Sequence, residues 1–200
     1  MPFRNKLYYV VRVENLPSVL KLGILSNHSC EDEHINHMSF ALDTVQEKRE
    51  SKEVPNGLSL HEYANLYFDA RNPAMFYLKK NSEHFERLCV LVLDGESTLS
   101  IPGAVVSDMN AACGVAGFYA ANDLTALNME RIYAPSWIHG GDNMETFRHK
   151  HEKLAEALIP HKIDPKHFIG IYAQSDKMEA EIKALGCTLK VKVYPNIFFL

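Results

Sequence analysis

The sequence has few cysteines, and no two of them stand in CxxC spacing. Cys30, Cys89, Cys113 and Cys187 lie far apart along the 200 residues. The pattern therefore predicts neither a disulfide framework nor a dithiol redox motif. Free cysteines of this kind are usually reduced and buried in the core.

Long apolar runs are absent as well. No segment approaches the roughly 20 apolar residues that a membrane-spanning helix needs. The opening residues, MPFRNK, are not followed by an apolar stretch of signal-peptide length. We therefore expect a cytoplasmic protein with no membrane partner.

An excess of positive charge is also absent. Lysine and arginine number 21 against 25 aspartates and glutamates, which gives a formal net charge of −4 with neutral histidines. Domains that coat nucleic acid through their overall charge are usually basic, so the net charge argues against this mode of binding. A nucleic acid, if bound, must be held by a few clustered cations in a local groove.

The length and the hydrophobic fraction of 46% are enough to form the core of one globular domain, residues 1–200. The apolar patterns predict strands at 8–13, 66–68, 88–93, 104–106, 168–172 and 189–193. They predict a helix that Asn15 caps and Gly23 ends, and further helices at 73–78, 124–132, 145–154 and 177–185. Residues 155–159 fit either a helix end or a strand. This order predicts an α+β fold with a mixed, mainly antiparallel sheet and short helices.

Three stretches, in chain order, resemble the DarT family of DNA ADP-ribosyltransferase toxins. Residues 7–25 are similar to the family's opening strand and its NLPSIL and GLLS helix. Residues 45–77 are similar to its IxxRR and DYVPFYFAPRSPMLY segments. The third set is SDMNAA at 107–112, Trp137 and AEALIP at 155–160, which resembles the TDGNA element, a mid-chain tryptophan and the AEFLV segment. Each motif alone is unspecific, and the ordered set carries the resemblance.

One departure lies in the first strand. Tyr9, Val11 and Arg12 stand where the family commonly has His, Thr and His. At the other end, the chain finishes in FFL, like the family's aromatic terminus.

The resemblance implies a fold, a reaction and partners. The fold is an ADP-ribosyltransferase-like split sheet around an NAD cleft. The reaction transfers ADP-ribose from NAD to a base of single-stranded DNA, thymine or guanine, without a metal. The protein is then the toxin of a toxin–antitoxin pair, and its antitoxin reverses or blocks the modification. The alternatives are an ADP-ribosyltransferase acting on RNA or protein, and a catalytically silent module that binds NAD or nucleic acid.

The resemblance places the catalytic carboxylate at Glu156. Breaking the bond between nicotinamide and ribose gives an oxocarbenium-like transition state, which a fixed carboxylate stabilises. If residues 155–159 form a strand, Glu156 and Leu158 share one face. The alternative is a solvated helix glutamate paired with Lys150 and Lys153.

Two cations match the family's arginine pair, with Lys48 in the first place and Arg49 in the second. A guanidinium fork suits a diphosphate or a base carbonyl. The resemblance therefore gives Arg49 a part in catalysis and in NAD binding, and it gives Lys48 a contact to nucleic acid. The alternative is a solvated run of mixed charge at 47–50.

The remaining NAD contacts come from the first strand, its helix and the aromatic stretch after residue 66. Any one of these side chains can instead be a packing residue, and Asn15 can instead be a helix cap. The expected NAD-binding residues besides Arg49 are Tyr9, Val11, Asn15, Tyr67 and Tyr77.

Contacts to DNA are expected from cations before Glu156 and from one aromatic ring. A base that reacts must leave the duplex stack, so single-stranded DNA is the natural substrate. Trp137 can stack on an unpaired base, or it can be a partly buried packing residue. The expected DNA-binding residues besides Lys48 are Trp137, Arg148, His149, Lys150 and Lys153.

Histidines and a cysteine at His28, Cys30, His34 and His37 resemble a metal cluster by composition only. Their spacing matches no standard zinc motif, and the transfer chemistry needs no metal. We expect no metal site.

Overall fold

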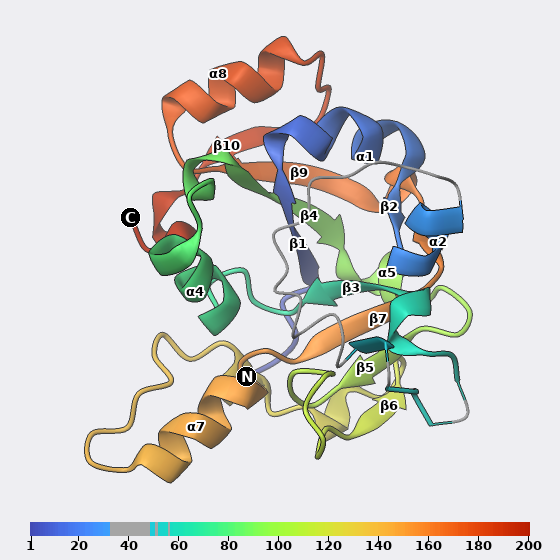
Figure 1. The fold of residues 1–200 in the computed structure, drawn as a ribbon, viewed down its shortest axis with the longest axis vertical. Coiled ribbons are helices and arrows are strands. Elements are labelled where there is room, and N and C mark those ends of the chain that lie inside the picture. Colours follow the sequence, from blue (N-terminus) through green and yellow to red (C-terminus); the bar gives the residue numbers. More distant parts are fainter. Residues whose placement is uncertain (33–48, 51, 56) are drawn as a thin grey trace.

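The computed structural model describes residues 1–32, 49–50, 52–55 and 57–200, and it has the expected α+β fold (Figure 1). The strands are β1 (Lys6–Arg12), β2 (Ile24–Leu25), β3 (Tyr63–Tyr67), β4 (Leu88–Asp94), β5 (Val105–Ser107), β6 (Phe118–Ala120), β7 (Glu156–Pro160), β8 (Lys162–Ile163), β9 (Phe168–Ala173) and β10 (Val191–Val193). The helices are α1 (Leu16–Leu22), α2 (Asn27–Asp32), α4 (Pro73–Asn81), α5 (Gly95–Leu99), α6 (Met129–Ile132), α7 (Asn143–Glu152) and α8 (Asp176–Ala184).

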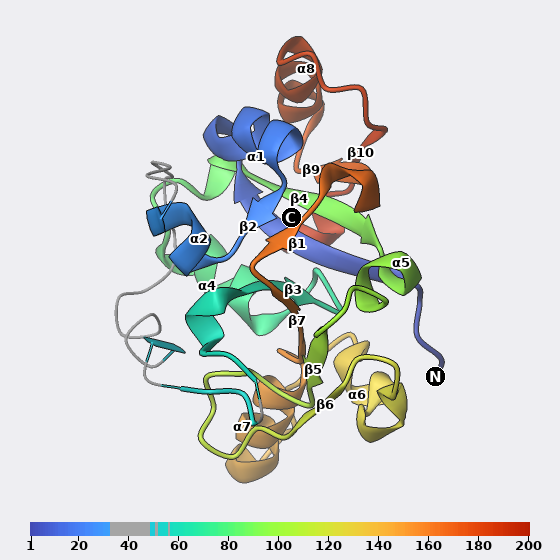
Figure 2. The ribbon, with the colours of Figure 1, turned by 90° about the vertical axis from the view of Figure 1, so that its right-hand side faces the viewer.

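The main sheet has eight strands in the order β10-β9-β4-β1-β3-β7-β5-β6. Its pairs are antiparallel except for the parallel pair β9–β10. The prediction of a mainly antiparallel sheet is therefore confirmed. Helices α8 and α7 lie at opposite ends of the molecule, with the sheet between them (Figure 1 and Figure 2).

Core residues cover both faces of the sheet. Strand β4 is apolar along most of its length and almost entirely buried, as expected for a central strand packed on both sides. Leu7 and Leu91 belong to the larger cluster on one face. Val10 and Val90 belong to a second cluster on the other face, which α4 and the C-terminal turn cover. The alternation along β1 and β4 therefore decides which of the two clusters each side chain joins.

Local signals explain several element boundaries. Asn72 caps α4, because its side chain accepts a hydrogen bond from the Met75 N–H at 3.0 Å. Gly23 ends α1 with φ of +95°, and a Cβ there would lie 2.3 Å from the Ile163 carbonyl oxygen. Only glycine allows this close approach of β2 to β8.

Three predicted helices differ in detail from the structure. The segment predicted as one helix at 124–132 is a 3₁₀ turn at Leu124–Ala126 followed by α6. The break follows from Asn128, whose side chain accepts from the Arg131 N–H at 3.2 Å and caps a new helix. Helix α7 ends at Glu152, and residues 156–160 are a strand. Asn15 precedes α1 as predicted, but its side chain makes no capping hydrogen bond.

Among the described residues, no helix combines the length and the apolar character that crossing a membrane requires.

Candidate active site

Glu156 is the first residue of β7, and it lies inside the protein. It is 1% exposed. Its backbone N–H donates to Ser107 Oγ on the neighbouring strand β5, at 3.2 Å. The backbone that carries Glu156 is therefore fixed between β3 and β5.

Each carboxylate oxygen of Glu156 has its own partner. Arg49 Nη1 donates to Oε2 at 3.0 Å, and the Ala111 backbone N–H donates to Oε1 at 3.1 Å. A buried carboxylate without such partners is costly, and hydrogen bonds to a charged acceptor are the strong ones. The result is a rigidly oriented anion of the kind that stabilises a developing positive charge.

Arg49 supplies the second half of this pair. The residue is 9% exposed, and its Nη2 atom is buried with no hydrogen-bond partner in the described part of the chain. Buried donors are normally satisfied. A ligand that places an acceptor oxygen here would satisfy this donor.

The loop after β5, residues 108–117, carries the Ala111 N–H and is held by hydrogen bonds within the loop and to α7. Asp108 Oδ1 accepts from the Gly117 N–H at 2.9 Å, which closes the loop at its base. The Asn110 N–H donates to the His151 carbonyl oxygen of α7 at 3.0 Å. These contacts fix the direction of the Ala111 N–H.

A row of side chains crosses the sheet beside Glu156. Tyr8 of β1 is opposite Tyr67 of β3, and Tyr67 is opposite Glu156 of β7. Residues directly opposite each other point to the same face. Burial raises the pKa of Tyr67, and the nearby Glu156 carboxylate raises it further. The Tyr67 phenol is therefore neutral at ordinary pH and can donate a hydrogen bond on the face of Glu156.

Two of the other predicted NAD contacts, Tyr9 and Val11, lie on the face of the sheet opposite Glu156. Tyr9 and Val11 alternate with Tyr8 and pack against the larger core cluster on the opposite face. Val11 is 2% exposed, so its side chain packs in the core, and a contact of this residue to NAD stays a prediction. Burial, with Cys30 nearby, raises the pKa of Tyr9 to about 12. Tyr77 lies on α4 and is 44% exposed.

Lys153 is not placed for a DNA contact, and that prediction is corrected. Its side chain has no exposed surface. Its Nζ donates to Asp69 Oδ2 at 2.6 Å and to the Ile132 carbonyl oxygen at 2.9 Å. A buried ammonium needs such partners, and here they tie the end of α7 to the segment after β3.

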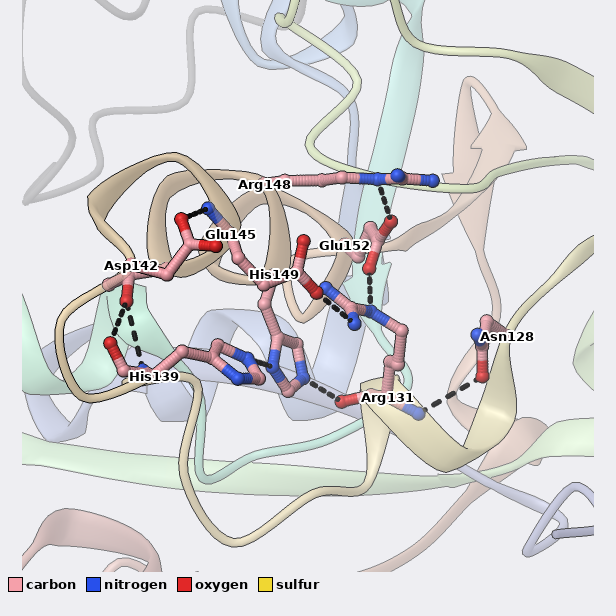
Figure 3. A network of polar contacts seen from close by, with 9 residues as sticks. Asn128, Arg131, His139, Asp142, Glu145, Arg148, His149 and Glu152 are labelled. Atoms are coloured by element: carbon pink, nitrogen blue, oxygen red, sulfur yellow. Dashed lines mark hydrogen bonds and ion pairs between the residues drawn. The ribbon is translucent and has the colours of Figure 1, made fainter.

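His149 is corrected for the same reason. It is 4% exposed. In the network of α6 and α7 its Nε2 lies 2.9 Å from the Arg131 carbonyl oxygen, and its Nδ1 lies 2.8 Å from His139 Nε2 (Figure 3). Both ring nitrogens have protein partners, so His149 holds the loop before α7 in place.

Trp137 also packs inside the protein. It is 9% exposed and meets Phe76 and Phe199 edge to face, with ring centroids 5.8 and 6.1 Å away. Trp137 is therefore packed among aromatic neighbours, as the alternative of a partly buried packing residue expects, and its contact to DNA stays a prediction.

Two predicted DNA contacts are on the surface. Lys150 is exposed. The side chain of Arg148 is 72% exposed, and its Nε donates to Glu152 Oε1 at 2.9 Å, which partly neutralises it (Figure 3). Lys48 lies outside the described residues.

No group of three or more His, Cys, Asp or Glu side chains that could hold a metal ion occurs in the described part of the chain. His34 and His37 of the sequence cluster lie outside it.

Sequence reasoning missed the residues that orient Glu156. Ser107 and Ala111 lie in the SDMNAA stretch, which drew attention only as a whole motif. A backbone N–H such as that of Ala111 has no side-chain signature. Asp69 was also missed, because its partner Lys153 stands 84 residues away.

Comparison with solved structures defines the class of protein. Thermosipho africanus DarTG in complex with ADP-ribose is 27% identical and superposes with a TM-score of 0.85 over 98% of this chain and 51% of that chain. Thermus sp. 2.9 DarT in complex with ADP-ribosylated ssDNA has the same fold, with a TM-score of 0.84, 21% identity and coverage of 98% and 97%. The same Thermus protein in complex with NAD+ superposes with a TM-score of 0.78 at 19% identity, over 98% of each chain. The fold is that of an NAD-dependent DNA ADP-ribosyltransferase.

Comparison of sequences gives the family. The family model described as "ssDNA thymidine ADP-ribosyltransferase, DarT" matches residues 8–199. A DNA ADP-ribosyl transferase–DNA ADP-ribosyl glycohydrolase fusion protein of Thermosipho africanus is 27% identical over 205 residues, which are 100% of this chain and 50% of the relative. A DNA ADP-ribosyl transferase of Thermus sp. is 25% identical over 79% of this chain and 76% of its own length. The chain belongs to the DarT family, as its motifs predict, and it spans about half the length of the fusion protein.

Proposed function

We propose that this chain transfers ADP-ribose from NAD to a thymine base of single-stranded DNA. The observation that carries the proposal is the buried Glu156 carboxylate, fixed on one oxygen by Arg49 and on the other by the Ala111 N–H. Family membership supports thymine rather than guanine as the base. NAD is the second substrate.

The transfer needs a leaving group, a stabilised cation and a nucleophile. The bond between ribose C1′ and the nicotinamide nitrogen breaks, and its electron pair leaves with nicotinamide. The ribose becomes oxocarbenium-like, and the fixed Glu156 carboxylate stabilises this charge. A thymine ring nitrogen then bonds to C1′, and its proton passes to Glu156 or to water.

Arg49 has two tasks in this proposal. Its Nη1 holds Glu156, and its Nη2, which has no hydrogen-bond partner among the described residues, donates to an oxygen of the NAD diphosphate or of the base. A guanidinium can serve two acceptors at once because its donors diverge in a fixed fork. Tyr67 adds a neutral donor on the same face as Glu156.

Single-stranded DNA is favoured as the acceptor by geometry and charge. The reacting nitrogen must come within about 3–3.5 Å of the ribose carbon, which a stacked and paired base cannot do. The chain is acidic overall, so the exposed Lys150 and Arg148, and Lys48, supply a small number of phosphate contacts.

A toxin role follows from the same reaction. A cell whose own DNA this enzyme marks needs a way to remove the mark or to block the transfer. The name of the Thermosipho africanus relative joins a transferase to a DNA ADP-ribosyl glycohydrolase in one chain, which supports an antitoxin of that chemistry as the partner here.

An acceptor panel tests the proposal. The protein is incubated with labelled NAD and, in separate reactions, with an oligonucleotide containing thymine, the same oligonucleotide with every thymine replaced, its duplex, the matching RNA and a protein mixture. The expected result is label on the single strand that contains thymine and little on the other acceptors. Label on the thymine-free strand identifies guanine or another base, label on RNA or protein alone overturns the DNA assignment, and no label on any acceptor indicates a silent binding module.

A further inference from the structure

Lys52 lies beside the active site and is absent from the reaction described above. It follows Arg49 by three residues, and its backbone N–H donates to the Arg49 carbonyl oxygen at 3.3 Å. Its carbonyl oxygen accepts from the Leu60 N–H at 2.9 Å. The backbone of Lys52, and with it the direction of its Cα–Cβ bond, is therefore held in place.

The side chain of Lys52 crosses to the loop at 108–117. Its Nζ donates to the Cys113 backbone carbonyl oxygen and lies 5.1 Å from the centre of the Phe118 ring. An ammonium over an aromatic face gains cation–π attraction. These contacts join the segment of Arg49 to the loop whose Ala111 N–H binds Glu156.

The contacts form a closed ring around one carboxylate. Arg49 holds Oε2 of Glu156 from one segment, and Ala111 holds Oε1 from the other. Lys52, through Cys113, ties the two segments directly to each other. Removing the Lys52 contact leaves both hydrogen bonds to Glu156 in place, but it allows the Arg49 segment and the 108–117 loop to move apart.

We propose that Lys52 is a positioning residue for the transfer reaction, which acts by locking the Arg49 segment to the 108–117 loop around Glu156. The inference rests on the proposed function for its kinetic consequence. Its geometric part, the lock between the two segments, stands on the contacts alone.

The charge of Lys52 is part of this role. Partial burial lowers the pKa of Lys52 below its ordinary value, and the surrounding Cys113, Glu156 and Asp108 act in the opposite direction. A neutral amine is a weaker donor to a carbonyl oxygen than an ammonium. The lock is therefore expected to weaken as alkaline pH removes this proton, and an arginine at the same place stays charged.

The test compares Lys52→Met, which keeps the aliphatic stem, with Lys52→Arg, which keeps the charge. Lys177→Met, on the exposed face of the distant helix α8, is the matched control. We expect Lys52→Met to lower kcat about tenfold or more, since small displacements of reacting groups cost that much. We expect KM for NAD and the melting temperature to stay near wild type. Lys52→Arg restores most of kcat and moves the alkaline limb of the kcat profile to higher pH, and Lys177→Met behaves like wild type.

Amide hydrogen exchange gives a second readout that does not need turnover. Lys52→Met is expected to speed exchange at Ala111 and its loop neighbours, and Lys52→Arg is expected to leave it near wild type. A Lys52→Met protein with wild-type kcat and wild-type exchange overturns the proposal, and so does a loss of kcat that Lys52→Arg does not restore. If the wild-type chain modifies no DNA, the proposed function fails, and the exchange result still decides whether Lys52 locks the loop.

Discussion

Arg49 Nη1 lies 3.0 Å from Glu156 Oε2, although the two residues are 107 positions apart in the sequence. The ion pair is buried, with 11% and 1% of the two side chains exposed. Removing one member of a buried pair leaves the other charge uncompensated. A substitution of Arg49 or Glu156 therefore distinguishes an effect on the reaction from an effect on folding only when the new side chain keeps the shape or the charge.

Arg49→Lys tests the need for a guanidinium fork. The substitution keeps the positive charge beside Glu156 and loses the second, divergent donor. We expect the melting temperature to fall by only a few degrees and the transfer rate at saturating NAD to fall about tenfold or more. Initial rates at limiting and saturating NAD provide the measurement. A folded Arg49→Lys protein with wild-type rates at both concentrations contradicts the role given to Nη2.

Lys153 and Lys150 form a matched pair of lysines, one buried and one exposed, near the end of α7. Lys153→Met leaves Asp69 without its cation inside the protein, so the free energy of unfolding should fall by about 3–5 kcal/mol. Lys150→Met should change it by less than about 0.5 kcal/mol. Denaturant unfolding of both variants decides the point. Equal effects at the two positions contradict the different roles of these lysines.

The same Lys150→Met protein tests the DNA contact. On single strands, log affinity falls with log salt at a slope of about −0.7 per phosphate contact. Removing one contact should therefore make the slope shallower by about 0.7 and weaken binding at low salt. The measurement is oligonucleotide affinity over a range of salt concentrations. An unchanged slope removes Lys150 from the interface.

Stability should fall on mild acidification because of His149. Burial, with Arg131 and His139 nearby, lowers the pKa of His149 below its ordinary value of 6.5. As pH falls through 6.5 the unfolded chain takes up this proton first, so the folded state loses stability until its own lower pKa is passed. Above 6.5 both states are neutral and the contribution is complete.

The measurement for His149 is the melting temperature between about pH 7.5 and about pH 5.5, a window set by the ordinary histidine pKa. We expect wild type to lose more stability over this range than His149→Gln, whose amide takes up no proton. His151 and His167, with pKa values also lowered by burial, account for the remaining fall in the variant. Identical profiles for wild type and variant contradict the account.

Local sequence signals predict much of the sheet. The apolar run that forms β4 and the β-branched and aromatic run that forms β1 are visible without the fold. Residues 155–159 fitted both a helix end and a strand, because their own sequence does not decide between the two. They form the strand β7 because β3 and β5 lie on either side and pair with it. A short apolar segment takes the structure that its neighbours supply.

Burial of polar residues could not be predicted in the same way. Lys153 and His149 look like surface groups in sequence, and Trp137 fits either a stacking or a packing role. Each is buried by partners that the local sequence does not reveal, such as Asp69 for Lys153. The choice of Glu156 as the proposed catalytic carboxylate rests on the family resemblance, and its orientation by the Ala111 N–H is a property of the backbone that residue types do not encode.

The most direct test of the central claim is transfer by Glu156→Gln. Glutamine keeps the volume and one acceptor oxygen, which can serve Arg49 or the Ala111 N–H, while its NH2 group faces the other donor. A melting curve therefore checks that the variant is folded. Loss of the charge that stabilises the ribosyl cation should cost about 3 kcal/mol or more, which is over a hundredfold in rate. The measurement is the rate of label transfer from NAD to a thymine-containing single strand by wild type and variant. The account predicts transfer by wild type and at most about one hundredth of that rate for Glu156→Gln; near-normal transfer by the folded variant would contradict it.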